Sequence, residues 1–400
     1  MTTIDDNKLL TRTRVLLFAL AAGILVANLY YVQPLTALLA QSFHVKLAWA
    51  GYLVTATQIG YVSGIVLLVP LSDVLNRRTL LSFMLLGNIS ALILAACSQN
   101  FAMFAIASVL AGMTSSALMV IVAMVASYAP NHGRGRIVGM VMTGLLLGIL
   151  LARTVSGAVA QLTGGWRSMY VVASVAVFAL LLILRSILPA EPARGKLHYA
   201  ALLASLLDIF RQQPLLRQRA LFSGLGLGTF SLFWTGLTFL LSGAPYYYSE
   251  LQIGLFGLVG AAGALAANSA GRLSDRGYAS HITWLLSIVT LAAWAFISLG
   301  ATSLGMLIAG VLLLDIGVMG LQVTHQSVIY KLAPESRGRV TTVFIAGGFL
   351  GAAAGSGIAS ASFVAGGWYA LCAAGAAMPL LMIMVWAAHR MQVKHELSNA

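Results

Sequence analysis

Long apolar runs separated by short polar segments dominate the sequence. An uncharged apolar run of about 18 residues or more is long enough to cross a bilayer as a helix. The pattern of runs and breaks predicts twelve such spans. They cover residues 15–40, 47–70, 79–97, 102–127, 137–162, 168–188, 219–243, 252–272, 281–300, 303–328, 340–363 and 367–388.

Composition indicates an integral membrane protein rather than a soluble multidomain one. Hydrophobic residues make up 60% of the chain and charged residues only 8%. The net charge of +13 lies in short loops, which is typical of membrane topology and not of nucleic-acid binding. Cys97 and Cys372 fit neither a metal spacing nor a disulfide framework, and we expect no metal and no cofactor.

The distribution of basic residues predicts the orientation. Of the 23 Lys and Arg residues, Lys46 and Arg167 fall in loops on one side and Arg153 falls inside a span. All the others lie on the side of the termini, so the positive-inside rule predicts that both termini are cytoplasmic. The first apolar segment reaches Ala40, too far for a cleaved signal peptide. We expect a multi-pass protein of the cell inner (plasma) membrane.

The two halves of the chain repeat each other. Ala129-Pro130 recurs as Ala333-Pro334, and Asp73 recurs as Asp275. An even number of spans separates the copies, so the repeats are parallel. The prediction is an all-α membrane fold of two six-helix repeats with pseudo-two-fold symmetry. Its parts are an N-terminal bundle over 1–188, a cytoplasmic linker over 189–218 and a C-terminal bundle over 219–400.

Small residues at helical spacing predict where helices pack closely. Gly144 and Gly148 form one smooth stripe on the fifth span, where another backbone can approach. The stripe recurs in the eleventh span as Gly347, Gly351 and Gly355.

The loops after spans two and eight resemble the signature of the major facilitator superfamily, roughly G-x-L-x-D-R-x-G-R-R. The first copy reads PLSDVLNRR from Pro70, with Val69 in place of the leading Gly. The second reads GRLSDRG from Gly271 and lacks the trailing basic pair. The resemblance extends over nearly the whole chain. It implies alternating access to a substrate site at the membrane midplane between the two halves.

In that family the loop Asp pairs with basic groups and a neighbouring helix end, which locks one conformation. The resemblance therefore implies a conformational gate, and the alternative is a solvated loop turn. The candidate gate residues are Asp73, Arg77, Arg78, Arg136, Asp275, Arg276 and Arg339.

The fifth span also resembles the family's antiporter motif, roughly G-x-x-x-G-P-x-x-G-G. Here Ile149 replaces the Pro, and Ala152-Arg153 replaces the final pair of glycines. The resemblance is to the twelve-span drug or metabolite exporters driven by protons.

Two charged residues lie deep in apolar segments, Arg153 and Asp315. A rise of about 1.5 Å per residue places Arg153 roughly 14 Å and Asp315 roughly 17 Å from the outer ends of their spans. A carboxyl group that is neutral when desolvated and charged when hydrated suits proton coupling, so Asp315 is the candidate proton carrier. A fixed ion pair or a helix contact is the alternative for Asp315.

For Arg153 three roles remain open. It can pair with Asp315 during coupling, bind an anionic substrate group, or bond to carbonyl groups as a structural strut. Isolated polar and aromatic residues in the spans are candidates for the cavity lining, although aromatic stripes are more often packing. The candidate cavity residues are Asn28, Tyr31, Gln33, Gln58, Arg153, Phe230, Trp234, Asn268 and Gln322.

A few further residues have simpler interpretations. His325 lies near the cytoplasmic end of the tenth span, where a proton-relay role is one possibility. Trp166, Trp368 and Tyr246 to Tyr248 fit interfacial anchoring.

We therefore expect a monomeric secondary transporter, an antiporter that exports drugs or metabolites in exchange for protons. Uptake of an organic anion or another small metabolite is the alternative. A membrane-embedded enzyme is disfavoured because no clustered histidines or paired acids occur within the spans, and a channel because no filter loop repeats. The sequence also lacks a nucleotide-binding P-loop for direct ATP drive.

Overall fold

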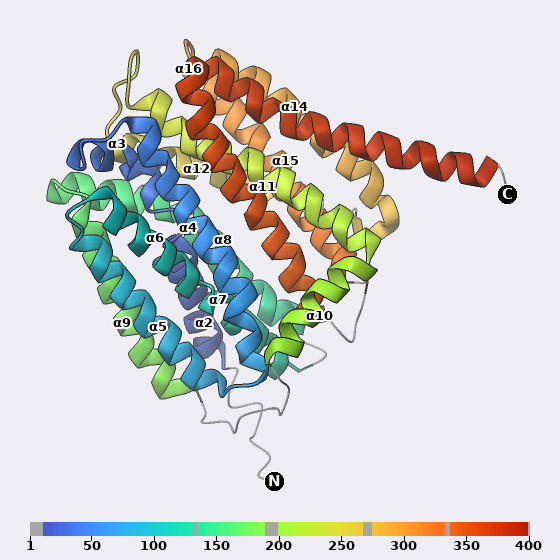
Figure 1. Cartoon of the computed structure of the whole chain (residues 1–400), viewed down its shortest axis with the longest axis horizontal. Coiled ribbons are helices and arrows are strands. Elements are labelled where there is room, and N and C mark those ends of the chain that lie inside the picture. The colour runs from blue at the N-terminus through green and yellow to red at the C-terminus, as the bar shows by residue number, and fades with distance from the viewer. Residues whose placement is uncertain are drawn as a thin grey trace, which may run out of the picture. The chain divides into compact units, whose positions relative to one another are not determined.

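The computed structural model describes residues 11–130, 134–188, 199–266, 274–330, 332 and 337–398. Over these ranges the chain is helical and contains no β-strand, which confirms the predicted all-α fold (Figure 1). Contacts group the chain into two compact units. Unit 1 comprises Met1–Asp208 and Tyr248–Gly257, and unit 2 comprises Ile209–Tyr247 and Leu258–Ala400.

Unit 1 contains the first six predicted spans. Its helices pack mainly in the pairs α2 with α8, α4 with α6, and α5 with α9. The helices are α2 (Arg12–Ala27), α3 (Val32–Ser42), α4 (Leu47–Leu67), η1 (Val69–Asp73), α5 (Arg77–Ala96), α6 (Phe101–Ser115), α7 (Ala117–Tyr128), α8 (Arg134–Thr163) and α9 (Arg167–Ile187). Helix α10 (Tyr199–Gln212) follows, within the range predicted as a linker.

Unit 2 contains the second set of spans, in which α11 packs along α16 and α14 packs along α15. Helix α12 belongs to this unit from Leu258 onward. The helices are α11 (Pro214–Leu241), α12 (Glu250–Ala266), η2 (Ser274–Tyr278), α14 (Ala279–Leu299), α15 (Leu304–Tyr330) and α16 (Arg337–Ser398).

Each of the twelve predicted spans corresponds to a helical run. Among the described residues, 10 runs are long and apolar enough to cross a membrane. One of them, Gly338–Ala388, contains two spans, because the backbone turns at Gly366 and at Gly367, where φ is 64°. The shorter apolar helix Glu250–Gly260 supplies the remaining span.

The apolar pattern predicted one continuous helix for the first span, but the structure has two. Helix α2 ends at Ala27 and α3 begins at Val32. The reason is Pro34, which has no N–H to donate to the carbonyl group of Tyr30 and whose ring crowds that group. The chain instead forms tighter bonds here, from the N–H of Tyr30 to the carbonyl of Ala27 at 2.9 Å and from that of Gln33 to the carbonyl of Tyr30 at 3.2 Å.

The fourth span is also interrupted, between α6 and α7. Ser116 separates the two helices, and its hydroxyl donates to the carbonyl oxygen of Met113 at 2.7 Å. Such back-bonding by Ser competes with the helical ladder and bends helices.

Both glycine stripes lie against the backbone of another helix. A Cβ atom added to Gly144 or Gly148 of α8 would collide with the carbonyl oxygen of Ala19 or Gly23 of α2. In unit 2, a Cβ atom on Gly351 or Gly355 would collide with the carbonyl oxygen of a glycine of α11, and one on Gly347 would lie 2.9 Å from the Cβ atom of Ala220. The colliding glycines of α11 are Gly224 and Gly228. Only glycine allows backbones to approach this closely.

The two tryptophans predicted to anchor at the membrane interface are instead buried, so that prediction is wrong. Trp166 is 3% exposed and lies among the rings of Phe43, Phe104 and Tyr170, with centroid distances of 5.2 to 6.1 Å. Trp368 is 7% exposed and donates from Nε1 to the carbonyl oxygen of Ile297 at 3.2 Å. Ring packing accounts for the position of Trp166, and the hydrogen bond to Ile297 holds the indole of Trp368.

Candidate functional site

Arg153 lies inside unit 1 on α8 and is only 2% exposed. Its Nε donates a hydrogen bond to Oε1 of Gln33 at 2.6 Å, and its Nη1 donates to the carbonyl oxygen of Ile149 at 3.1 Å. The guanidinium carbon lies 4.7 Å from the centroid of the Tyr30 ring. The interruption between α2 and α3 therefore places two residues of the first span against one cation.

These three partners are neutral, and they offset part of the cost of a buried charge. A charged side chain at the centre of a membrane costs about 2.5–3.5 kcal/mol on insertion scales. A cation over an aromatic face regains roughly 2 kcal/mol when it is desolvated. The contacts with Gln33 and Ile149 also fix the plane of the guanidinium group, which suits recognition of a carboxylate or a phosphate.

The predicted cavity residue Tyr31 lies in the same interruption. It is 6% exposed, and its carbonyl oxygen accepts a hydrogen bond from the hydroxyl of Ser156 at 2.8 Å. Ser156 follows Arg153 by one helical turn of α8. Side-chain bonds from α8 thus hold the interrupted span at two successive turns.

Asn28 points to a different set of partners, an amide cluster that the sequence analysis did not find. Its Nδ2 donates to Oδ1 of Asn88 at 2.9 Å and to Oγ of Ser115 at 3.3 Å. Asn88 in turn donates to the carbonyl oxygen of Ala111 at 3.0 Å and to Oγ1 of Thr114 at 2.9 Å. The cluster joins the interruption of the first span to that of the fourth, across α5.

Asp315 lies on α15 and is a buried acid of unit 2, 2% exposed. Its carboxyl group packs against α12, where a Cβ atom added to Gly260 would collide with Oδ2. The same added atom would lie 3.0 Å from Cζ2 of Trp234, so the ring of Trp234 borders the acid. A Cβ atom on Gly263 would lie 2.9 Å from Cβ of Asp315. Glycines on α12 therefore make the room that this carboxyl group occupies.

Aromatic rings of α11 continue from Trp234. Phe230 is 5% exposed, and its ring centroid lies 6.0 Å from that of Trp234. Phe233 contacts Trp234 at 5.5 Å and Trp294 of α14 at 6.2 Å. Trp294 donates from Nε1 to Oγ1 of Thr229 at 2.7 Å. In unit 2 these rings form a packed wall beside Asp315.

The single amides predicted to line the cavity have different environments. Gln322 of α15 exchanges hydrogen bonds with Ser223 of α11, accepting from its hydroxyl at 2.9 Å and donating to its carbonyl oxygen at 3.1 Å. Gln58 is buried in α4. Asn268 lies outside the described residues.

His325 has a basic neighbour that the sequence analysis missed. Nη1 of Arg219 lies 3.1 Å from Nδ1 of His325 and 3.5 Å from Oγ1 of Thr283. His325 is fully buried, and its ring lies 5.5 Å from that of Phe222. An arginine can only donate, so Nδ1 accepts and the imidazole is neutral in this arrangement.

The predicted gate residues lie at the ends of helices. Asp73 is exposed at the end of η1, while Nη1 of Arg77 donates to the hydroxyl of Ser127 at 2.7 Å. Nη2 of Arg78 donates to the carbonyl oxygen of Arg185 at 2.7 Å. The remaining gate arginines, Arg136, Arg276 and Arg339, are exposed. The side chain of Asp275 lies outside the described residues.

The described ranges contain no group of three His, Cys, Asp or Glu residues that could hold a metal ion. In the described parts of the spans, the polar groups include the guanidinium of Arg153, the carboxyl group of Asp315, amides, hydroxyls and the Arg219–His325 pair of unit 2. Such groups can bind a polar organic molecule and can exchange a proton.

Comparisons with known proteins support a transporter. The chain is 41% identical over 380 residues to the uncharacterized transporter YgaY of Escherichia coli O157:H7, covering 95% of this chain and 96% of that protein. It is 24% identical over 341 residues to the "Probable sugar efflux transporter" of Helicobacter pylori (strain G27), covering 83% of each chain. The crystal structure of the human organic anion transporter MFSD10 superimposes with a TM-score of 0.70 at 20% identity, over 94% of this chain and all of that one.

The family model agrees with the fold. The model of the Major Facilitator Superfamily matches residues 17–355, which include the glycine stripes, Arg153 and Asp315. Together with the two helical repeats, this match identifies the chain: it belongs to the major facilitator superfamily, and it is a multi-pass membrane transporter.

Proposed function

We propose that this transporter exports a small organic molecule, a drug or a metabolite, in exchange for protons by alternating access. Asp315 carries the proton, and Arg153 belongs to the coupling or to the substrate site. The protein acts as a monomer in the bacterial inner membrane with both termini in the cytoplasm.

The observation that carries the proposal is that unit 1 buries the cationic side chain of Arg153 and unit 2 buries the acidic side chain of Asp315. Arg153 and Asp315 are each 2% exposed. Ionisable residues within membrane spans are costly, and they commonly mark substrate pathways and proton relays. Protonation of the buried acid would then be linked to movement of one repeat against the other.

Two observations favour export over uptake. The relative from Helicobacter pylori is named for sugar efflux. The close packing of α8 on α2 through Gly144 and Gly148 also agrees with the partial antiporter motif in the fifth span. Arg153 favours one alternative, in which the substrate is an organic anion held by the guanidinium group.

The first experiment identifies a ligand. The unfolding temperature of the purified protein is followed with drugs, sugars, nucleosides, amino acids and organic anions. A ligand that binds the folded state at a hundred times its dissociation constant adds about 2.7 kcal/mol of stability. The measurement with each stabilising ligand is then repeated on the Arg153→Ala variant. Stabilisation by anions alone, lost in this variant, would reject drug export and make Arg153 a substrate ligand.

The second experiment tests proton coupling in proteoliposomes. An imposed pH gradient should drive uphill accumulation of the ligand by the wild type. Asp315→Asn keeps the size of the side chain but cannot carry the proton as a carboxylate does. It should therefore lose gradient-driven accumulation and keep exchange of labelled for unlabelled ligand. Unchanged uphill accumulation by Asp315→Asn would reject Asp315 as the proton carrier.

A further inference from the structure

A pocket in unit 1 does not include Arg153, and one of its lining residues is the candidate gate residue Arg78. Seven residues of α5, the turn before it and α9 line it: Asn76, Arg78, Thr79, Ser82, Phe83, Leu86 and Arg185. Its volume is about 460 Å³. We infer that this pocket binds the phosphate of an anionic phospholipid headgroup, with an acyl chain along Phe83 and Leu86.

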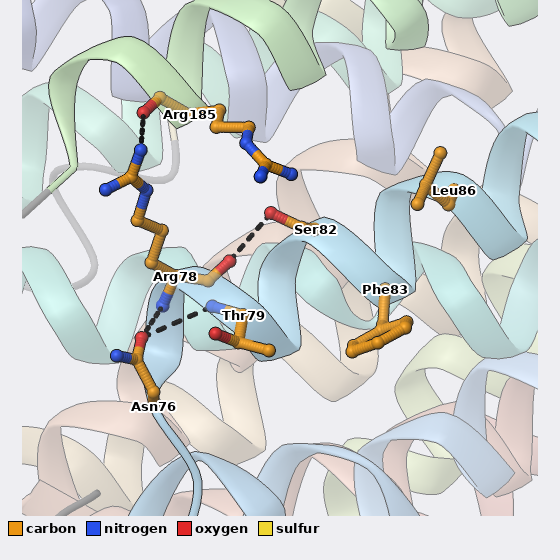
Figure 2. Close-up of a pocket in the computed structure, with 7 residues that line it drawn as sticks. All are labelled: Asn76, Arg78, Thr79, Ser82, Phe83, Leu86 and Arg185. Atoms are coloured by element: carbon orange, nitrogen blue, oxygen red, sulfur yellow. Dashed lines mark hydrogen bonds between the residues drawn. The ribbon is translucent and has the colours of Figure 1, made fainter. Parts of the chain in front are cut away.

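Positive charge converges at the polar end of the pocket. Figure 2 shows the guanidinium groups of Arg78 and Arg185 between α5 and α9. Nη2 of Arg78 donates to the backbone carbonyl oxygen of Arg185 at 2.7 Å, a bond that caps the C-terminal end of α9. The guanidinium group of Arg78 has five N–H donors, and this bond uses one of them. None of the seven lining residues carries a carboxylate, so an anion that bridges the two arginines would relieve their repulsion.

The turn before α5 adds to the attraction for an anion. Oδ1 of Asn76 accepts from the backbone N–H groups of Arg78 at 2.9 Å and Thr79 at 3.3 Å, so α5 begins at this pocket. The N-terminus of a helix carries a partial positive charge. The hydroxyl of Ser82 donates to the carbonyl oxygen of Arg78 at 2.8 Å and can still accept a hydrogen bond.

The other end of the pocket is apolar and open to its surroundings. Phe83 is 69% exposed and Leu86 is 46% exposed, and on α9 the side chain of Leu182 is 55% exposed. A free phosphate ion would gain nothing from such a surface, whereas an acyl chain would lie along it.

The spacing of the two ends matches the depth profile of a bilayer. Arg78 and Leu86 are eight residues apart on one helix, which corresponds to about 12 Å. The headgroup region on each side of a bilayer is roughly 5–8 Å thick, so a phosphate at Arg78 leaves Leu86 level with the acyl chains. Basic pockets between membrane helices on the cytoplasmic side suit anionic lipid headgroups. The proposed orientation places this end of α5 on that side.

Native mass spectrometry of the detergent-solubilised protein tests the inference. The wild type should retain phosphatidylglycerol in preference to phosphatidylcholine with the same acyl chains. One arginine near an anionic lipid is worth about fivefold in binding, so Arg185→Ala should lower phosphatidylglycerol retention by about that factor. The double variant Arg78→Ala/Arg185→Ala should lower it further. Arg185 is exposed, so Arg185→Ala should still fold. This holds even if the double variant is less stable because it lacks the bond from Arg78 to the end of α9.

The matched control is Arg12→Ala, which removes an exposed arginine of α2 outside the pocket and should leave retention unchanged. Equal retention by Arg185→Ala and Arg12→Ala would overturn the inference. A second arm separates a lipid from a free anion. Phe83→Ala should weaken phosphatidylglycerol retention. If inorganic phosphate displaces the lipid from the wild type and Phe83→Ala has no effect, the pocket is a site for free anions and not for a lipid.

Discussion

The Nε–H of Arg153 and Oε1 of Gln33 form a hydrogen bond of 2.6 Å between residues 120 positions apart in the chain. The bond ties α8 to the first turn of α3, directly after the interruption of the first span. A movement of α8 along its axis must therefore move this interruption or break the bond. Buried charge and local backbone irregularity are coupled at one place in unit 1.

Gln33→Leu should destabilise the protein, because the buried Nε–H of Arg153 loses its acceptor. The expected loss is about 1–3 kcal/mol, the cost of an unsatisfied buried polar group. Thermal unfolding in one detergent measures it. Gln41→Leu changes an exposed glutamine of the same helix and serves as the control. Equal unfolding temperatures for the two variants would contradict the importance of the bond.

Gly148→Ala should lower stability by about 1–3 kcal/mol, since the added methyl group collides with the backbone of Gly23. Gly139→Ala lies on the same helix, and its added methyl group meets nothing within 4 Å. That control should be neutral or slightly stabilising, because Ala favours a helix more than Gly does. The comparison needs only unfolding temperatures, and a neutral Gly148→Ala would show that α2 and α8 can separate without cost.

Gly260→Ala should impair proton coupling through Asp315. The added methyl group collides with Oδ2 of the acid and must displace the carboxyl group. Accumulation driven by a pH gradient should fall more than ligand exchange in the same proteoliposomes. Gly305→Ala lies on the helix of Asp315 in open space and should preserve both activities. An equal fall of accumulation and exchange in Gly260→Ala would indicate general damage and not a coupling defect.

Asn88→Ala should destabilise unit 1 by roughly 1–2 kcal/mol, since hydrogen bonds between membrane helices contribute on average about 0.6 kcal/mol each. Asn88 bonds to Asn28, Thr114 and Ser115. A double-mutant cycle with Asn28→Ala measures the interaction free energy between the two amides. The double variant should cost less than the sum of the single variants, and strict additivity would mean that the two amides act independently.

The length and apolar character of the runs were sufficient to predict the spans, because a bilayer imposes both. The interruption at residues 28–31 was missed even though Pro34 lies within the predicted first span. The apolar pattern alone does not show that a proline inside a helix clashes with the carbonyl group four residues before it and removes that hydrogen bond. Helix α8 (Arg134–Thr163), by contrast, differs from the predicted span 137–162 by only a few residues at each end.

The site was predictable only in part. Arg153 and Asp315 stand out because charge is rare in apolar runs, but their neighbours depend on lateral packing that one sequence does not reveal. Arg219 escaped notice because it lies near the end of a span, where basic residues are common. Trp166 was misjudged because interfacial tryptophans and buried tryptophans follow the same pattern along the chain.

The glycine contacts have a practical consequence for experiments that attach probes. In both repeats the glycine faces a main-chain carbonyl group, which no second mutation can remove. The clash made by a cysteine at Gly148 or Gly351 therefore cannot be relieved by a substitution on the facing helix. Fluorophores and spin labels that report on the transport cycle belong instead at Gly165 or Gly305, where an added Cβ atom meets nothing within 4 Å. Distances measured from those positions would follow each repeat without disturbing the joint that holds it together.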